Sequence, residues 1–320
     1  MKSVGIIANP ASGKDIRRLV AYGSVVTSNE KINMLKRILL GIDSMGIKDV
    51  SMMPDASGIG NRALDRLPLS MNVSFLDMIL GNNQDDSTRA AEQLNRMGVA
   101  CIVTLGGDGT NRVVAKSSGT TPLLSVATGT NNAFCTMAEG TLAGIAAGVI
   151  AQESGALDEV VIRAPRLEIW DDTGFVDSAL VDVVISKAEF VGSRAIWDEA
   201  TLSEVFLTRA EPGNIGFSSL GGYLCHVPAD AGKGLYIAVG PGGQTVRAPI
   251  APGRIRPIPV ESFRIFEAGE KLPVRQTPAV IALDGEREIV VAKGDRYYVS
   301  FSPDGPYVVD LTKTLNRASK

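Results

Sequence analysis

Gly106-Gly107-Asp108-Gly109-Thr110 is the stretch that decides the fold of this 320-residue chain. The apolar run at residues 99–105 predicts a buried strand before it, and residues 111–116 can begin a helix after it. Three glycines around one carboxylate let phosphate oxygens approach the backbone N–H groups, and a helix N-terminus adds positive partial charge. The motif indicates either a phosphate-binding loop, in which Asp108 binds Mg²⁺ or accepts a proton, or a tight turn with Asp108 as N-cap.

The residues around this motif predict an α/β domain with a parallel sheet. Strand-like and helical segments alternate along the first half of the chain, which is typical of parallel sheets. Asp86 and Thr88 can cap one of these helices and Gly98 can end it. The expected strands are residues 3–8, 50–53, 73–76, 99–105 and 123–127, and the expected helices are 33–42, 89–97 and an Ala-rich segment within 133–151.

Two more loops rich in small polar residues follow predicted strands. One is Asn9-Pro10-Ala11-Ser12-Gly13 and the other is Gly129-Thr130-Asn131-Asn132. In an open parallel sheet such loops gather at one edge, where ligands bind, so we expect them beside Gly106–Thr110. The alternatives are a strand-to-helix turn for the first loop and an Asn-rich N-cap for the second.

Two common nucleotide motifs are excluded by single residues. Ala8 stands where a Walker A loop requires its first glycine, and Asp15 replaces the Ser or Thr at its end. Arg112 occupies the third glycine position of a dinucleotide-binding fingerprint, so an ordinary Rossmann oxidoreductase is disfavoured.

The sequence changes character near residue 156. We expect an α/β nucleotide-binding domain at residues 1–155 and a β-rich substrate-binding domain, a β-sandwich, at residues 156–320. The last segment is a candidate for returning to the first domain. Asp284-Gly285 is a strong hairpin signal, and the Pro- and Gly-rich residues 240–259 read as a loop or an interdomain connection.

Composition excludes several classes of protein. A formal net charge of -3 provides no basic field for nucleic acid or anionic lipid. The single histidine, His226, and three separated cysteines exclude a structural zinc site and fit a reducing cytoplasm. The uncharged stretch at residues 140–152 is shorter than the roughly 20 residues of a membrane span, so we expect no stable membrane anchor.

Taken together, these motifs resemble the superfamily of NAD kinases and diacylglycerol- or sphingosine-type lipid kinases. Residues 9–13 are similar to its Asn-Pro-x-Ser-Gly turn, and residues 129–134 to the lipid-kinase Gly-Thr-x-Asn-Asp-Phe motif. Residues 212–222 resemble an NAD-kinase loop, and residues 284–286 the late Asp-Gly-Glu of both branches. Within the superfamily, the chain most resembles the ATP-NAD-kinase-like protein X family of acetoin-catabolism operons.

The resemblance implies an ATP-dependent kinase that phosphorylates a hydroxyl group, with ATP and Mg²⁺ as cofactors and a small nucleotide as substrate. NAD is the leading acceptor, through the 2′-OH of its adenosine ribose. The resemblance also implies a homo-oligomer. Asp108 would be general base, Mg²⁺ ligand or both, and Asp182, Asn214 and Glu286 would bind the acceptor. The implied phosphate- and nucleotide-binding residues are Asn9, Ser12, Gly13, Gly106, Gly107, Gly109, Thr110, Gly129, Thr130, Asn131 and Asn132.

Departures from the family patterns fall on the acceptor side. Val181 replaces an asparagine that NAD kinases use on the dinucleotide, and Asp182 stands in for their glutamate. Ala133 removes the acidic residue of the lipid-kinase motif. Two alternatives therefore stay open: a diacylglycerol-type lipid kinase, and a non-catalytic nucleotide-binding regulator linked to acetoin catabolism.

Overall fold

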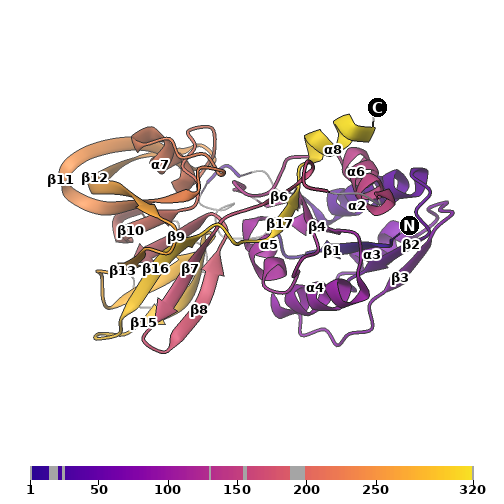
Figure 1. The fold of residues 1–320 in the computed structure, drawn as a ribbon, viewed down its shortest axis with the longest axis horizontal. Helices are drawn as coiled ribbons and strands as arrows, with labels where there is room; N and C mark the ends of the chain where they lie inside the picture. The colour runs from indigo at the N-terminus through magenta and orange to yellow at the C-terminus, as the bar shows by residue number, and fades with distance from the viewer. Residues whose placement is uncertain are drawn as a thin grey trace.

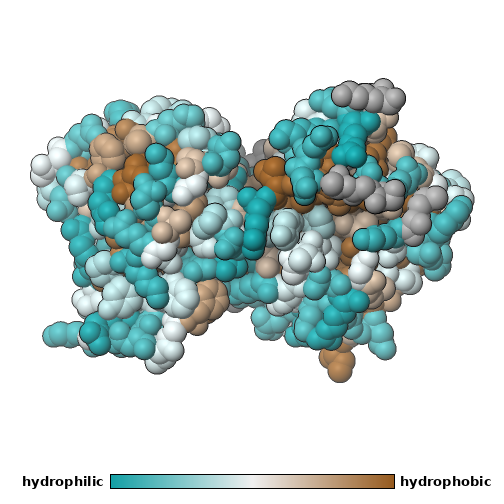
Figure 2. Space-filling view, in the orientation of Figure 1, coloured by the Kyte–Doolittle hydropathy of each residue, from teal (hydrophilic) through white to brown (hydrophobic). Residues whose placement is uncertain are grey.

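The computed structural model describes residues 2–13, 21–23, 26–129, 131–153, 157–187 and 199–318. The ribbon divides into two lobes joined along a narrow junction (Figure 1). The first domain, at right, is built around a largely parallel sheet, and the second domain, at left, around two antiparallel sheets. Hydrophilic residues lie on both sides of the junction in the view of Figure 2.

The first domain confirms the predicted parallel α/β architecture. Its seven strands lie in the order β3-β2-β1-β4-β5-β17-β6, and all neighbours are parallel except β17 and β6. The strands are β1 (Val4–Ala8), β2 (Asp49–Met52), β3 (Asn72–Phe75), β4 (Ile102–Gly106), β5 (Leu123–Ala127), β6 (Val161–Arg163) and β17 (Tyr307–Val309).

Helices cover both faces of this sheet. One apolar core joins the sheet to α2, α3 and α6, and a second joins its other face to α4 and α5. The short helix α8 packs against α6 near the C-terminus (Figure 1). The helices are α2 (Ser28–Ser44), α3 (Ile59–Leu64), α4 (Asp85–Met97), α5 (Asp108–Ala115), α6 (Gly140–Gln152) and α8 (Leu311–Ala318). Among the residues described, no helix has the length and apolar character that crossing a bilayer requires.

One capping prediction and two capping alternatives in this domain are wrong. The N-cap of α5 is Gly107, and the Asp108 side chain bonds elsewhere. The Gly129–Asn132 loop ends well before α6, whose N-cap is Glu139. Helix α4 begins at Asp85, so the predicted cap residues lie inside its first turn. The helix termination at Gly98 is confirmed, because this glycine has the left-handed conformation that favours glycine.

The second domain consists of a six-stranded sheet packed on a four-stranded one. The sheet orders are β12-β11-β10-β9-β14-β15 and β13-β16-β7-β8. Their inner faces share one core, in which Phe266 makes edge-to-face contacts with Phe206 and Phe301. Helix α7 covers the outer face of the larger sheet. The elements are β7 (Arg166–Asp171), β8 (Gly174–Ala179), β9 (Asp182–Ser186), β10 (Leu202–Leu207), α7 (Phe217–Leu224), β11 (Lys233–Ala251), β12 (Arg254–Glu267), β13 (Lys271–Pro273), β14 (Ala279–Leu283), β15 (Glu286–Val291) and β16 (Tyr297–Ser302), with a short 3₁₀ helix at Glu199–Thr201.

The prediction of a loop at residues 240–259 is wrong, because they belong to the long β11–β12 hairpin. Register shifts after Val239 mark a bulge at the glycines, where the ribbon bends. Pro257 and Pro259 are tolerated because β12 is the edge strand of its sheet.

The end of the chain crosses back between the sheets. After β16 in the second domain, β17 pairs in parallel with β5 of the first domain and antiparallel with β6. The predicted boundary at residues 155/156 lies outside the described residues.

Candidate functional site

Three loops meet at the carboxyl edge of the parallel sheet. They follow β1, β4 and β5, which are neighbours, and the strand order reverses between β1 and β4. The Asn9 amide nitrogen donates to the Thr110 hydroxyl oxygen at 2.8 Å, and the hydroxyl oxygens of Ser12 and Thr128 lie 2.8 Å apart. Open α/β sheets bind ligands at such a switch point.

Glycines allow these loops to touch backbone to backbone. A Cβ on Gly129 would lie 2.8 Å from the Cα of Gly107, too close for any real side chain. Gly13 has a φ of +69°, and a Cβ there would lie 2.7 Å from the Thr128 carbonyl oxygen. The first-turn N–H groups of α5 emerge beside this contact, and such groups have no partner within their helix.

Lys31 fixes the position of the Asn9–Gly13 loop. Its side chain is 1% exposed, and its ammonium group donates to the carbonyl oxygens of Asn9 (3.1 Å), Pro10 (3.1 Å) and Ser12 (2.7 Å). Turning three carbonyl groups toward one cation fixes the course of the loop. Sequence reasoning missed this residue, although a lysine in line with the buried Leu35 and Ile38 of α2 is a readable signal.

Asp108 lies at the start of α5 and is 8% exposed. Its two carboxylate oxygens accept backbone N–H groups from Ala133 (2.8 Å), Phe134 (3.1 Å) and Cys135 (3.1 Å). A carboxylate offers about four acceptor positions, so about one remains for a metal ion or a hydroxyl group. Asp108 therefore anchors residues 133–135, which follow the Gly129–Asn132 loop. It also lines a cleft between the loops.

Asn111, one turn later on α5, is fully buried and was also missed from the sequence. Its amide oxygen accepts the hydroxyls of Thr104 (2.7 Å) and Ser125 (2.9 Å), on β4 and β5. Its amide nitrogen donates to the Gly107 carbonyl oxygen at 3.1 Å. This residue thus ties the central loop to both strands.

Arg209 is a third residue that sequence reasoning missed. Its guanidinium lies 5.6 Å from the centroid of the Phe134 ring and donates to the Ala133 carbonyl oxygen at 3.2 Å. Burial lowers the pKa of Arg209, while Asp108 and other acids nearby oppose that shift. This cation supports the segment that Asp108 binds.

The second domain contributes the β14–β15 turn. Asp284 (φ 49°) and Gly285 (φ 80°) both have positive φ, which confirms the predicted Asp-Gly hairpin. The Asp284 carboxylate accepts N–H groups from Leu180 (2.9 Å), Val181 (2.7 Å) and Asp182 (3.2 Å). Burial raises the pKa of Asp284 to about 6, although these bonds and Arg112 lower it.

The loops and this turn enclose a cleft of about 670 Å³. The Asn9–Gly13 loop, Gly107–Thr110 and Gly129 form one wall, and Asp284 and Glu286 reach it from the second domain. The Glu286 carboxylate approaches α5 so closely that a Cβ on Gly109 would lie 3.2 Å from its Oε1. The cleft is wide enough for a nucleotide.

Beside the cleft lies a pocket of about 30 Å³, which shares Asp108, Asn131 and Asp284 with it. Asp182, Phe217 and Ile250 also line this small pocket. The buried amide oxygens of Asn131 and Asn132 have no hydrogen-bond partner within the part of the chain that the structure describes. Asn131 lines both cavities, so its unsatisfied amide oxygen suits a ligand that donates a hydrogen bond.

Three of the predicted residues that the structure describes line neither cavity: Gly106, Asn132 and Asn214. The Asn214 amide nitrogen donates to Glu211 (3.2 Å) and Ser218 (3.1 Å) within its own loop. Thr130 lies outside the described residues.

The donor set fits a metal ion carried by a nucleotide rather than one caged by protein. No group of three or more His, Cys, Asp or Glu side chains among the described residues is arranged to hold a metal. Asp108 and Glu286 both line the cleft. Mg²⁺ usually binds through one or two carboxylates together with substrate phosphates, which is the coordination that these two residues permit.

Comparisons with known proteins divide the chain into the same two halves. Residues 4–154 match the model of the ATP-NAD kinase N-terminal domain, and residues 165–304 match the acetoin catabolism protein X C-terminal domain. The acetoin catabolism protein X of Cupriavidus necator is 37% identical over 331 aligned residues, covering 99% of this chain and 92% of the relative.

Proposed function

This chain belongs to the acetoin catabolism protein X family and has an NAD-kinase-like N-terminal domain, and from that premise we propose that it is an ATP-dependent phosphotransferase. The proposed reaction moves the γ-phosphoryl group of ATP to the 2′-OH of the adenosine ribose of NAD. The products are ADP, NADP and one proton.

One observation carries this proposal: glycine-lined loops from three adjacent parallel strands meet a carboxylate-bearing turn from the second domain across a single cleft. Phosphoryl transfer asks a protein mainly to position reactants and to stabilise charge. Backbone N–H groups at Gly107 and along the first turn of α5 would donate hydrogen bonds to phosphate oxygens. Because Lys31 and Asn111 fix the loops from behind, these donors are oriented before a ligand arrives.

The carboxylates would divide the remaining tasks. Asp108 would accept the proton of the attacking hydroxyl at its remaining acceptor position. Glu286, which also lines the cleft, would hold Mg²⁺ together with the phosphates of ATP, and the metal when bound would neutralise charge on those phosphates. Asn131 and Asp182, which line the small pocket beside Asp108, would contact the ribose of the acceptor.

A panel of acceptors tests the proposal. Purified protein is incubated with Mg²⁺ and ATP together with NAD, NADH or diacylglycerol in mixed micelles, and ADP and the phosphorylated product are quantified by mass spectrometry. The proposal expects stoichiometric ADP and NADP in the NAD arm. A product in the lipid arm alone would replace it with the lipid-kinase alternative.

A second candidate is a nucleotide-binding regulator without catalysis. The observation that favours it is the size of the pocket beside Asp108, about 30 Å³, which Phe217 and Ile250 close from the second domain. A nucleoside does not fit this volume, so acceptor binding requires the pocket to open. Tight Mg²⁺–ATP binding with no transfer to any acceptor would favour this candidate.

A further inference from the structure

Arg112 joins the two domains from the helix that begins with Asp108. Its side chain is 1% exposed and lies one turn after Asp108 on α5. One terminal nitrogen donates to Asp177 Oδ2 on β8 at 3.2 Å, and the other to Glu288 Oε1 on β15 at 2.9 Å. The Nζ atom of Lys116, which also belongs to the first domain, lies 2.8 Å from Asp177 Oδ1. Both acids belong to the second domain, so the guanidinium bridges the junction.

The backbone of β15 is irregular at the point of contact. Ile281 pairs with Ile289 and Ala282 with Arg287, so Glu288 has no opposite residue on β14. A bulge of this kind changes the direction of nearby side chains, and the Glu288 carboxylate that projects from it lies 2.9 Å from Arg112. Two residues earlier, Glu286 meets Gly109. Strand β15 therefore contacts helix α5 twice, through Glu286 in the cleft and through Glu288 at the ion pair with Arg112.

We propose that Arg112 is a positioning residue for phosphoryl transfer: its bridge to Asp177 and Glu288 sets Asp108 and Glu286 at their working separation across the cleft. This inference rests on the proposed function. A buried ion pair is weak evidence for stability, because apolar side chains of similar size often stabilise a fold as well or better. What the guanidinium adds is direction, since its donors lie in one rigid plane, whereas the donors of an ammonium group rotate freely.

A positioning role for Arg112 predicts different effects on the affinity for ATP and on turnover. The loops that would hold the phosphates of ATP all come from the first domain, so breaking the bridge should leave the affinity for ATP without Mg²⁺ within about twofold. Catalysis needs carboxylates from both domains, and misplacing reacting groups by about 1 Å lowers turnover by roughly 10²-fold. A residue that only stabilised the fold would change affinity, turnover and unfolding together.

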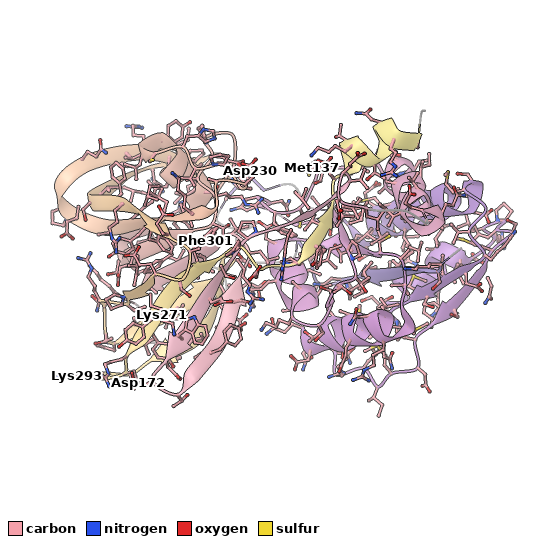
Figure 3. All side chains as sticks on the ribbon, in the orientation of Figure 1. Met137, Asp172, Asp230, Lys271, Lys293 and Phe301 are labelled. Carbon is pink, nitrogen blue, oxygen red and sulfur yellow. The ribbon has the colours of Figure 1, made fainter. Side chains whose placement is uncertain are left out.

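The test uses the full chain with Asp177→Asn and Glu288→Gln, singly and combined, because both carboxylates are partly exposed and their amides are close in shape. Arg112→Lys is the conservative variant. The control is Asp172→Asn, which breaks an exposed ion pair with Arg296 at the end of the second domain away from the first (Figure 3). We expect kcat to fall by about 10- to 100-fold in the double variant and partial activity in Arg112→Lys. Asp172→Asn should match the wild type.

Domain orientation is measured independently of activity. Spin labels on Asn72→Cys and Glu267→Cys, two exposed positions in different domains, are placed in a Cys225→Ser background. The inference expects one narrow distance distribution in the wild-type background and a broader one in the double variant. Unchanged distances with unchanged kcat, or parallel losses of affinity and turnover, would overturn it. If the wild type transfers no phosphoryl group, the proposed function fails, and the distance distributions still decide whether Arg112 sets the domain orientation.

Discussion

Asp108 and Asp284 are held in the same way. Each carboxylate is buried and accepts the N–H groups of three consecutive residues from another segment: 133–135 for Asp108 and 180–182 for Asp284. Asp108 therefore anchors residues beyond the end of β5, and Asp284 anchors residues at the start of β9. The two acids also line the same cleft, so they combine a structural task with a position from which chemistry is possible.

Replacing Asp108 by asparagine should affect both tasks. An amide cannot accept a proton, so we expect turnover to fall by about 10²–10⁴-fold. Because its NH₂ group would face backbone donors, the free energy of unfolding should also fall by about 1–3 kcal/mol. Kinetics at saturating ATP and urea denaturation measure the two effects.

The matched control for that variant is Asp43→Asn. Asp43 also binds backbone N–H groups, those of Ser70 and Met71, and hydrogen bonds from Ser70 lower its pKa. It lies outside both cavities. Asp43→Asn should lower stability and keep turnover. Equal turnover in the two variants would remove Asp108 from the reaction.

The raised pKa of Asp284 predicts a pH dependence of stability. The folded-state pKa of about 6 lies above 3.8, the usual pKa of an aspartate carboxyl group, so between these values the folded state binds more protons than the unfolded state. The contribution is complete below pH 3.8 and is lost as pH rises through 6, a change on the order of 3 kcal/mol.

Asp284→Asn should remove that change. Denaturant unfolding at pH 4.5 and pH 7.5 should show the advantage of the wild type over the variant shrinking as pH rises. Groups far from Asp284 titrate equally in both proteins and cancel in the difference. A difference that is constant or grows with pH would contradict the assignment.

At the scale of elements, the site depends on how closely the loop after β4, which contains Gly107, approaches the loop after β5, which contains Gly129. The contact between Gly107 and Gly129 leaves no room for a methyl group. Gly129→Ala should force the loops apart and raise the Kd for Mg²⁺–ATP by at least about tenfold, measured by calorimetry. Gly213→Ala is the control, because a Cβ there would meet nothing within 4 Å. Unchanged affinity in Gly129→Ala would place the nucleotide elsewhere.

The elements also show what sequence reasoning can reach. Strand–loop–helix patterns predicted β1, β4 and β5 and the gathering of their loops, because apolar runs and glycines act locally. The part of the β11–β12 hairpin at residues 240–259 was not predictable, since its prolines and glycines signal a loop unless the strand is known to lie at an edge. Lys31 and Asn111 were missed for a similar reason: their partners are carbonyl and hydroxyl groups that only the fold brings near.

At the scale of the molecule, the cleft requires both domains and the return of the chain between them. The first domain contributes the loops and the second the Asp284–Glu286 turn, while β17 adds a strand to the first sheet after the second domain is complete. The sequence predicted the two fold types from the change of pattern near residue 156. It could not predict the bridge at Arg112, because charges on separate domains carry no local signal of their pairing.

The most direct test of phosphoryl transfer is ³¹P NMR of the full-length protein with Mg²⁺, ATP and NAD. We expect a new phosphomonoester resonance, that of the adenosine 2′-phosphate, which grows in step with ADP and is absent when Mg²⁺ is chelated. Unchanged ATP, or ADP accompanied by inorganic phosphate alone, would contradict it.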